Sequence, residues 1–204
     1  MADINLEQYY FNPDSEVICG DMVPPINDSH NFDYDNYPSV VERYYTKYYY
    51  FRNGDINEAH TLLNHSNSIC LVGLADTHIA VKKGIKSMTF DVGNFDRSKN
   101  QVTGKGKKGA MNLQVTSCLA IVTCDDDSTY RISSTIQGKL IEVNERLLSN
   151  PKLIGQDGHG YIAIVLPKLD KCKEQLEKLV TEEEYQAQLK QQIDENGVEI
   201  KSVV

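Results

Sequence analysis

Several features that define other classes of protein are missing from this sequence of 204 residues. It contains no apolar run near the roughly 18 residues that a membrane-spanning helix needs. Its N-terminus lacks the positive flank and apolar stretch of a signal peptide. The five cysteines are far apart and show no C-x-x-C spacing, which argues against a disulfide framework and a zinc site. We therefore expect a soluble protein of the cytosol or nucleus whose thiols are reduced.

Positive charge is also scarce. The chain has 21 Lys and Arg against 29 Asp and Glu, a formal net charge of -8, and no long basic run. Proteins that bind nucleic acid through its phosphates usually carry the opposite balance, so we do not expect direct nucleic-acid binding. RNA or DNA binding in the nucleus stays open only as an interpretation that requires tight, salt-sensitive association.

The one basic cluster lies in a glycine-rich segment, residues 93–111. It consists of Arg97, Lys99, Lys105, Lys107 and Lys108. A phosphate-binding loop needs the pattern G-x-x-x-x-G-K-[ST] ahead of a helix, whereas Lys108 is followed by Gly109 and no helical pattern comes next. Nucleotide binding is therefore disfavoured. Two interpretations stay open: a solvated loop, or a docking patch for an acidic protein.

The residues that commonly bind metals do not fall into a metal-binding pattern. His60, His65 and His78 are close in sequence but lack the H-x-x-x-H spacing with a carboxylate, and His159 lies far away in a glycine-rich loop. The acidic run at residues 125–127 lacks the twelve-residue calcium-loop pattern and is interpreted as a solvated turn. We predict no metal, no cofactor and no catalytic residue.

The hydrophobic patterning predicts one mainly β domain with flanking helices. The β-prone runs occupy residues 68–74, 79–81, 85–92, 113–123, 130–133, 136–143 and 161–166. Residues 1–38 are expected to form a disordered tail, residues 39–168 the β domain, and residues 169–204 a C-terminal helical segment and tail. In the last strand, alternation should place Ile164 on the buried face, so an aspartate there should prevent folding.

An aromatic helix is expected to lead the β domain. Ser39 and Glu42 form a capping box, and apolar and aromatic residues then recur at helical spacings toward Gly54. The rings of Tyr44, Tyr45 and Tyr48 allow two interpretations, a face that binds a partner or a face packed onto the domain. A second capping box, Thr181 with Glu184, opens the last of two C-terminal helices, expected over residues 169–179 and 181–193.

Several runs resemble the lipoyl and biotinyl carriers, especially the glycine-cleavage H protein. They are KKGA at residues 107–110, CLAIV at 118–122, IQGKLIEVNE at 136–145 and GYIAIVLP at 160–167. The resemblance implies a barrel-sandwich hybrid, a single H-protein-like motif with hairpin halves about Gly104 and Gly138. In the carriers a lysine lies at a hairpin tip about eleven residues before this glycine, and here that count reaches Asp127. A carboxylate cannot form the carrier amide.

The carrier interpretation stays open as an alternative in a different form. A lipoyl- or biotinyl-type carrier, or an acyl-transfer accessory protein, would have to use another lysine, and Lys139 is the nearest in sequence to Gly138. Lys139 falls inside the expected strand instead of at a hairpin tip.

A wider resemblance covers residues 41–185. VERYYTKYY at 41–49, LNHSNSIC at 63–70, VTGKGKKGA at 102–110, GKLIEVNE at 138–145 and GYIAIVLPK at 160–168 occur in an order similar to the Abitram family, also called Simiate. The resemblance implies a non-enzymatic protein that binds actin monomers and filaments, regulates actin polymerisation, filopodia and lamellipodia, and modulates transcription. It further implies a location in nuclear speckles and in the cytoplasm, including actin-rich projections.

Overall fold

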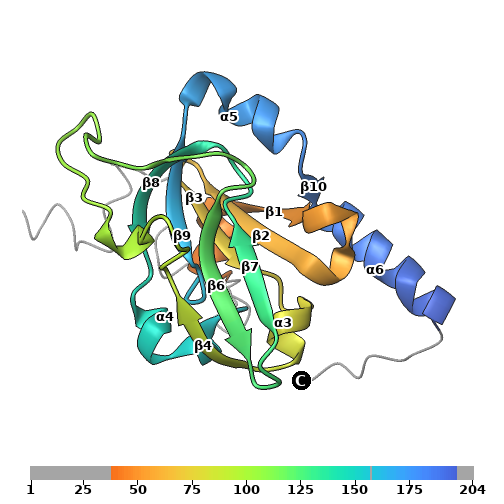
Figure 1. Ribbon diagram of the computed structural model, residues 1–204. Helices are drawn as coiled ribbons and strands as arrows, with labels where there is room; N and C mark the ends of the chain where they lie inside the picture. The colour runs from red at the N-terminus through yellow and green to blue at the C-terminus, as the bar shows by residue number, and fades with distance from the viewer. Residues whose placement is uncertain (1–37, 157, 197–204) are drawn as a thin grey trace, which may run out of the picture. The chain divides into compact units, whose positions relative to one another are not determined.

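A computed structural model describes residues 38–156 and 158–196 of the chain (Figure 1). The tail expected to be disordered, residues 1–38, lies outside the described residues except for Pro38. Residues 197–204, the end of the C-terminal segment, also lie outside them. No helix in the described part is both long and apolar enough to cross a membrane.

The described strands form two antiparallel sheets. A large sheet has the strand order β10-β1-β2-β3-β9-β8-β5, and a small sheet has the order β4-β6-β7. The strands are β1 (Tyr45–Phe51), β2 (Ala59–His65), β3 (Cys70–Leu74), β4 (Ile85–Thr89), β5 (Asn112–Leu113), β6 (Cys118–Cys124), β7 (Thr129–Ser133), β8 (Gly138–Val143), β9 (Ala163–Pro167) and β10 (Val180–Thr181). The predicted mainly β fold with flanking helices is confirmed, although the sheets do not close into a barrel.

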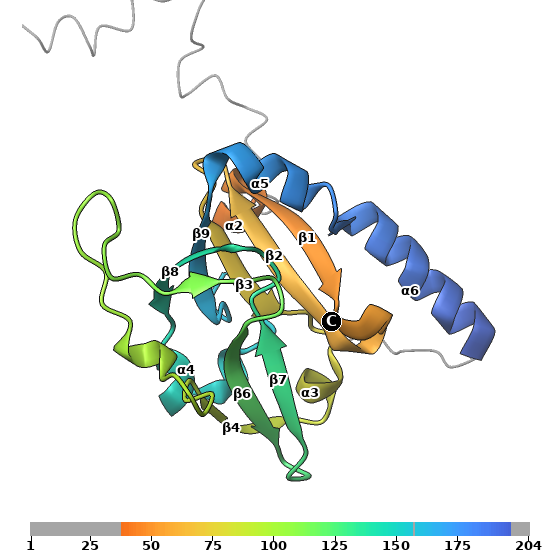
Figure 2. The ribbon, with the colours of Figure 1, turned by 45° about the horizontal axis from the view of Figure 1, so that its top comes forward.

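Short helices connect and cover the sheets. The α-helices are α2 (Val40–Tyr44), α3 (Ile79–Lys82), α4 (Arg146–Ser149), α5 (Leu169–Leu176) and α6 (Glu182–Asn196), and the 3-10 helices are η2 (Arg52–Gly54), η3 (Ile56–Glu58), η4 (Arg97–Lys99) and η5 (Pro151–Leu153). Figures 1 and 2 show α6 running beside β1, and the segment between η4 and β5 projecting away from the sheets.

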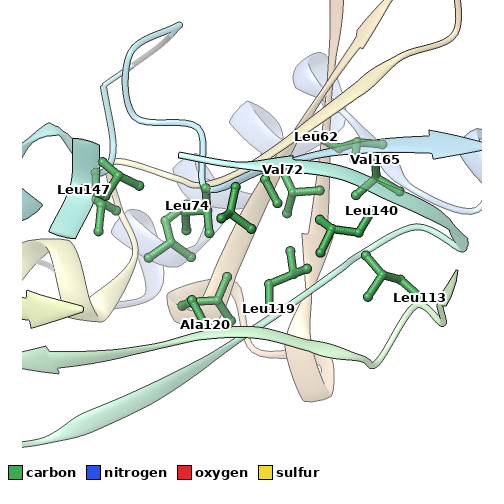
Figure 3. Packing of buried hydrophobic residues seen from close by; sticks show 14 of the residues in the cluster. Leu62, Val72, Leu74, Leu113, Leu119, Ala120, Leu140, Leu147 and Val165 are labelled. Carbon is green, nitrogen blue, oxygen red and sulfur yellow. The ribbon is translucent and has the colours of Figure 1, made fainter. Parts of the chain in front are cut away.

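The main core lies between the two sheets, whose side chains point toward one another (Figure 3). The large sheet contributes Leu62, Val72, Leu140 and Val165, the small sheet contributes Leu119 and Ala120, and α4 adds Leu147. All of these side chains are fully buried. Burial of a leucine-sized side chain stabilises a fold by about 1.5–3 kcal/mol, so this layer is the main source of stability.

A smaller cluster fastens α6 to β1. The rings of Tyr49 and Tyr185 stack with their centroids 3.7 Å apart, and Phe51 lies 5.9 Å from Tyr185. The Tyr185 hydroxyl also forms a hydrogen bond with the Thr77 hydroxyl. The C-terminal helix therefore packs directly on the β domain.

The expected aromatic helix is correct only at its start. The capping box is present, because the Ser39 amide donates to the Glu42 carboxylate at 2.6 Å and the Glu42 amide donates to the Ser39 hydroxyl at 3.2 Å. The helix ends at Tyr44, however, and the following Tyr45–Phe51 segment is β1, which pairs along its whole length with β2. Aromatic residues favour strands, and a full ladder outweighs one more helical turn.

Two other sequence predictions are wrong. Residues 79–81, expected in a strand, lie in α3, because the Nδ1 atom of His78 caps this helix by accepting from the Ala80 amide at 3.0 Å. The residues about Gly104 form a loop with one isolated bridge, between Thr103 and Lys108, and do not form a β-hairpin.

Local predictions elsewhere are confirmed. The β6–β7 hairpin and the helices α5 and α6 are all present. The second capping box is also formed, with the Thr181 amide 2.9 Å from the Glu184 carboxylate and the Glu184 amide 3.3 Å from the Thr181 hydroxyl.

The alternation of β9 is confirmed, but its core face is the opposite of the predicted one. Ala163 and Val165 are fully buried, whereas Ile164 is half-buried. We therefore expect Val165→Asp to place an unpaired charge in the core and to remove more than about 4 kcal/mol, which abolishes cooperative folding. Ile164→Asp, whose carboxylate keeps contact with water, should cost about 1–3 kcal/mol and leave a cooperative transition.

Thermal melts followed by circular dichroism would compare these two variants with the parent chain. Parental melting of the Val165→Asp variant would contradict the assignment of the core face.

Candidate partner-binding site

The three tyrosines predicted to bind a partner do not form one exposed face. Tyr44 is 48% exposed and its ring stacks on His65, with centroids 6.2 Å apart. Tyr45 meets the same histidine edge-on at 4.9 Å. Tyr48 is half-buried against the main core. The packing interpretation therefore holds for Tyr48, and Tyr44 is the tyrosine of this group with the most accessible ring.

Arg97 and Lys99 are engaged in local contacts. The Arg97 Nε atom donates to the Cys118 carbonyl at 3.1 Å, and its guanidinium lies 5.7 Å from the centre of the Phe95 ring. Lys99 forms an ion pair with Asp96 at 3.3 Å. Arg97 thus fastens η4 to β6, which leaves it little freedom to bind a partner.

The other three predicted cations lie on the projecting loop between η4 and β5. Lys105 and Lys108 are exposed and Lys107 is half-buried. The loop is pinned at its base, where the backbones of Thr103 and Lys108 exchange two hydrogen bonds of 2.9 Å. Gly109 is required there, since its φ is 82° and an added Cβ would lie 2.3 Å from the Gln101 carbonyl oxygen.

A groove of about 480 Å³ lies between this loop and α5. We call it the lysine groove, because Lys105, Lys107, Lys139, Lys168 and Lys171 line it together with the apolar residues Leu113, Leu166 and Pro167. None of its lining residues is an Asp or a Glu. The amino group of Lys139, on β8, donates to the Gly106 carbonyl at 3.0 Å and holds the loop to the sheet.

Sequence reasoning missed Lys139, Lys168 and Lys171 as members of a common basic site. These lysines are separated from the basic loop by more than thirty positions, and no local pattern marks them. Strand pairing brings them together, because β8 pairs with both β5 and β9, and α5 follows β9 directly.

The tyrosines and the lysine groove lie at the same end of the large sheet. Leu113 pairs with Gly138 and Gly138 with Pro167, while at the far side Tyr45 pairs with His65. From β5 to β1 the strand order takes five steps, which corresponds to about 24 Å at normal strand spacing. This separation is too large for one small ligand but falls within the width of a protein–protein interface.

The acidic β6–β7 turn is exposed and ion-paired. Asp127 has a positive φ of 59° and forms an ion pair of 2.8 Å with Lys86. Asp126 pairs with Lys83 at 2.7 Å, and this hydrogen-bonded contact, together with Ser128, lowers the pKa of the Asp126 carboxyl. The equivalence of Asp127 with the carrier lysine stays a prediction.

Two of the histidines are buried side by side. The His60 Nδ1 atom lies 2.9 Å from the Glu58 carbonyl, to which it donates, and its Nε2 atom accepts from the Ser133 amide at 3.2 Å. The His78 ring is 5.7 Å away, edge-on. Burial is the main cause that lowers the pKa of His60 to about 4 and the pKa of His78 to about 3, so both rings are neutral at physiological pH.

The buried thiols are poor nucleophiles. Cys70 and Cys172 lie in the main core, and burial raises the pKa of both thiols. Within the described ranges 38–156 and 158–196, no group of three or more His, Cys, Asp or Glu side chains is arranged to hold a metal ion.

Comparisons with known proteins connect this geometry to a family. Protein Abitram of Drosophila melanogaster is 49% identical over 191 residues, which cover 93% of this chain and 86% of that protein. Protein Abitram of Homo sapiens is 39% identical over 155 residues, 73% of this chain and 86% of that protein. The chain belongs to the Abitram family.

The chain also matches the family model of the glycine cleavage H-protein over residues 113–192. This match confirms the expected H-protein-like fold, and it spans β5 to α6, including Asp127 and Lys139. A solved glycine cleavage system H protein from Mycobacterium marinum is 15% identical, with a TM-score of 0.42, covering 75% of this chain and 92% of that chain.

The buried histidines predict a pH dependence of stability. Because their pKa values in the folded chain lie below the ordinary value of 6.5, the unfolded chain binds more protons between about pH 6.5 and pH 3. The free energy of unfolding should be highest above pH 6.5 and should fall with decreasing pH, by at most about 3 kcal/mol for His60 and about 5 kcal/mol for His78. Arg52 adds to the depression of both pKa values, and Asp55 opposes it at His78.

Urea unfolding at several pH values would measure this slope. His78→Asn keeps an acceptor for the helix cap of α3 and should flatten the slope below pH 6.5. His159→Asn, a change at an exposed position, should leave it unaltered. An unchanged slope in the His78→Asn variant would contradict the assigned neutral state.

Proposed function

We propose that the chain is a non-enzymatic actin-binding protein that regulates actin polymerisation and the dynamics of filopodia and lamellipodia. Its partners would be actin monomers and filaments. The observation that carries the proposal is membership of the Abitram family, with 49% identity to the Drosophila melanogaster protein over 93% of the chain. The same family resemblance supports a location in nuclear speckles and in the cytoplasm, including actin-rich projections.

The charge distribution supports docking of an acidic protein. Lys105, Lys107 and Lys108 project on a loop at one end of the large sheet, and Tyr44 and Tyr45 lie at the same end. Clustered charges steer an oppositely charged partner, and a neighbouring aromatic ring supplies apolar contact area. A surface about 24 Å across is of the size that a standard interface occupies on each partner.

A non-enzymatic role fits the state of the potential catalytic groups. The rings of His60 and His78 are buried and hydrogen-bonded to the backbone, and the thiols of Cys70 and Cys172 are inside the core. These groups hold the fold together and do not face a substrate. Modulation of transcription would then act through protein partners, in keeping with the net charge of -8.

The match to the H-protein model favours one alternative, a carrier or acyl-transfer accessory protein. The carrier chemistry needs a mobile lysine at a hairpin tip, whereas Lys139 lies inside β8, opposite Leu166, with its amino group on the Gly106 carbonyl. The β6–β7 tip carries Asp127. We therefore expect the intact mass of the chain, purified from its native source, to show no lipoyl or biotinyl increment. An increment that maps to Lys139 would support the carrier function instead.

Actin binding is tested by co-sedimentation with filaments and by assembly assays with monomers. We expect the purified chain to bind actin. The triple variant Lys105→Glu, Lys107→Glu and Lys108→Glu should associate with actin at least about tenfold more slowly, and its association rate should depend less on salt. The melting temperature should stay close to that of the parent, since these lysines make no buried contact.

A matched control reverses three exposed lysines elsewhere, Lys82, Lys152 and Lys190, with the same change in net charge. If the parent chain alters neither filament mass nor assembly rate, the proposed function is wrong. If the loop variant binds as the control does, the contact lies elsewhere, and the Tyr44 surface is the next to be substituted.

A further inference from the structure

The charges of the chain are divided unevenly between its parts. Residues 1–37 contain eight Asp and Glu and no Lys or Arg. Subtracting these eight from the 29 acidic residues of the chain leaves 21, equal to the 21 Lys and Arg, all of which lie within residues 38–204. The part of the sequence that contains the β domain is therefore neutral overall, and a cluster of one sign within it is a local feature.

The lysine groove is such a cluster. Five lysines line it without a single carboxylate among the lining residues. None of them takes part in an ion pair within the described part of the chain, whereas Lys83, Lys86, Lys99 and Lys178 each pair with an Asp or Glu. Lysines of one sign gathered without a contact ion pair raise the local positive potential, which favours an anionic ligand; Glu174, which interacts electrostatically with Lys171, offsets part of it.

The groove is held in place by the surrounding structure. The Gln137 amide donates to the Gln175 side chain at 2.7 Å, and the Gln175 side chain donates back to the Gln137 carbonyl at 3.4 Å. Cys172 and Leu176 anchor α5 in the main core. These contacts fix α5, and with it Lys168 and Lys171, at a set position relative to β8.

The apolar lining of the lysine groove and the neighbouring strand β5 favour a peptide with an apolar side chain as the ligand. Leu166, which is half-buried, supplies apolar surface beside the buried residues Leu113 and Pro167, and the volume of about 480 Å³ falls in the range of ligand-binding pockets. In the described sheet β5 pairs with β8 alone, and since the Gln114 amide and carbonyl are both hydrogen-bonded to Ser117, Asn112 is the position where the backbone of an extended chain could add to this edge. The side chains of Asn112 and Gln114 lie at this edge and offer further hydrogen bonds.

The groove contains lysines and no arginine, and this favours a ligand with several carboxylates along a peptide over a ligand with one phosphate. Arginine, with its planar fork, is the residue that best matches a phosphate, and the groove contains none. Lysines on three separate segments present point charges at separate positions. Several side-chain carboxylates along an extended peptide would match that arrangement.

We propose that the lysine groove binds an extended acidic peptide segment of a partner protein. Its carboxylates pair with the lysines, an apolar side chain rests on Leu166, and its backbone meets β5 at Asn112. The proposal goes beyond actin binding and does not rest on it.

The test uses the full chain and a fluorescent nine-residue peptide in which Glu and Leu alternate, with a control peptide that has Gln in place of Glu. Fluorescence anisotropy should show saturable, salt-sensitive binding of the Glu peptide and none of the Gln peptide. Lys168→Gln with Lys171→Gln should weaken binding about tenfold, because each removes one rim charge. Lys82→Gln with Lys152→Gln, at exposed positions outside the groove, should bind as the parent does.

Hydrogen exchange of the backbone amides gives a second measurement. Nonspecific attraction between the peptide and the lysines would not change it. Peptide binding should increase the protection of the Asn112 amide in β5, since the next amide, that of Gln114, already donates to the Ser117 hydroxyl. Binding that is unchanged in the Lys168→Gln, Lys171→Gln variant overturns the proposal, as does binding without added protection at β5. Binding of inorganic phosphate or of phosphatidylserine vesicles that requires Lys168 and Lys171, without peptide binding, would assign the groove to phosphate and also overturn it.

The Lys168→Gln, Lys171→Gln variant distinguishes the groove from the proposed actin contact. Loss of peptide binding with retained actin co-sedimentation would support a groove independent of actin. The basic-loop variant cannot make this separation, because Lys105 and Lys107 line the groove and only Lys108 lies outside it.

Discussion

The apolar layer between the large and small sheets determines where every surface feature of this chain lies. Leu140 and Val165, from the paired strands β8 and β9, meet Leu119 of β6 across this layer, and all three side chains are fully buried. A layer packed to this degree tolerates little displacement of its strands. The ends of β5, β8 and β9 are consequently held in register. The groove residues on these strands therefore keep fixed positions relative to one another.

The surface charges are handled in two different ways. At the β6–β7 turn, Asp126 and Asp127 are each paired with a lysine, Lys83 and Lys86, so two of the three carboxylates of the acidic run are ion-paired. At the groove, by contrast, five lysines gather with no Asp or Glu among the lining residues. Paired exposed charges contribute little to stability and attract no partner, whereas unpaired charges of one sign raise the local potential. The groove is therefore one place in the described chain where several charges of one sign are available for recognition.

Much of the local structure was predictable from short stretches of sequence. The capping boxes at Ser39 and Thr181 and the turn of the β6–β7 hairpin depend on residues three or four positions apart, and all are present. The H-protein-like fold was predictable from runs such as residues 136–145, because these runs make up whole strands with their turns. Burial of the histidines was not predictable, since His60 and His78 become neighbours only when β2 and the cap of α3 pack together.

The sequence by itself determined the caps, the turns and the alternation of the strands, because each depends on backbone preferences and side chains within a few residues. Tertiary structure decided the rest. Residues 45–51 became a strand because pairing with β2 outweighs a weak helical preference, and β9 turned Val165 instead of Ile164 to the core because the opposing sheet lies on that side. The lysine groove joins residues from positions 105 to 171, and only the pairing of β8 with β5 and β9 brings them together. Contacts between distant segments depend on the whole chain folding at once, and no local pattern encodes them.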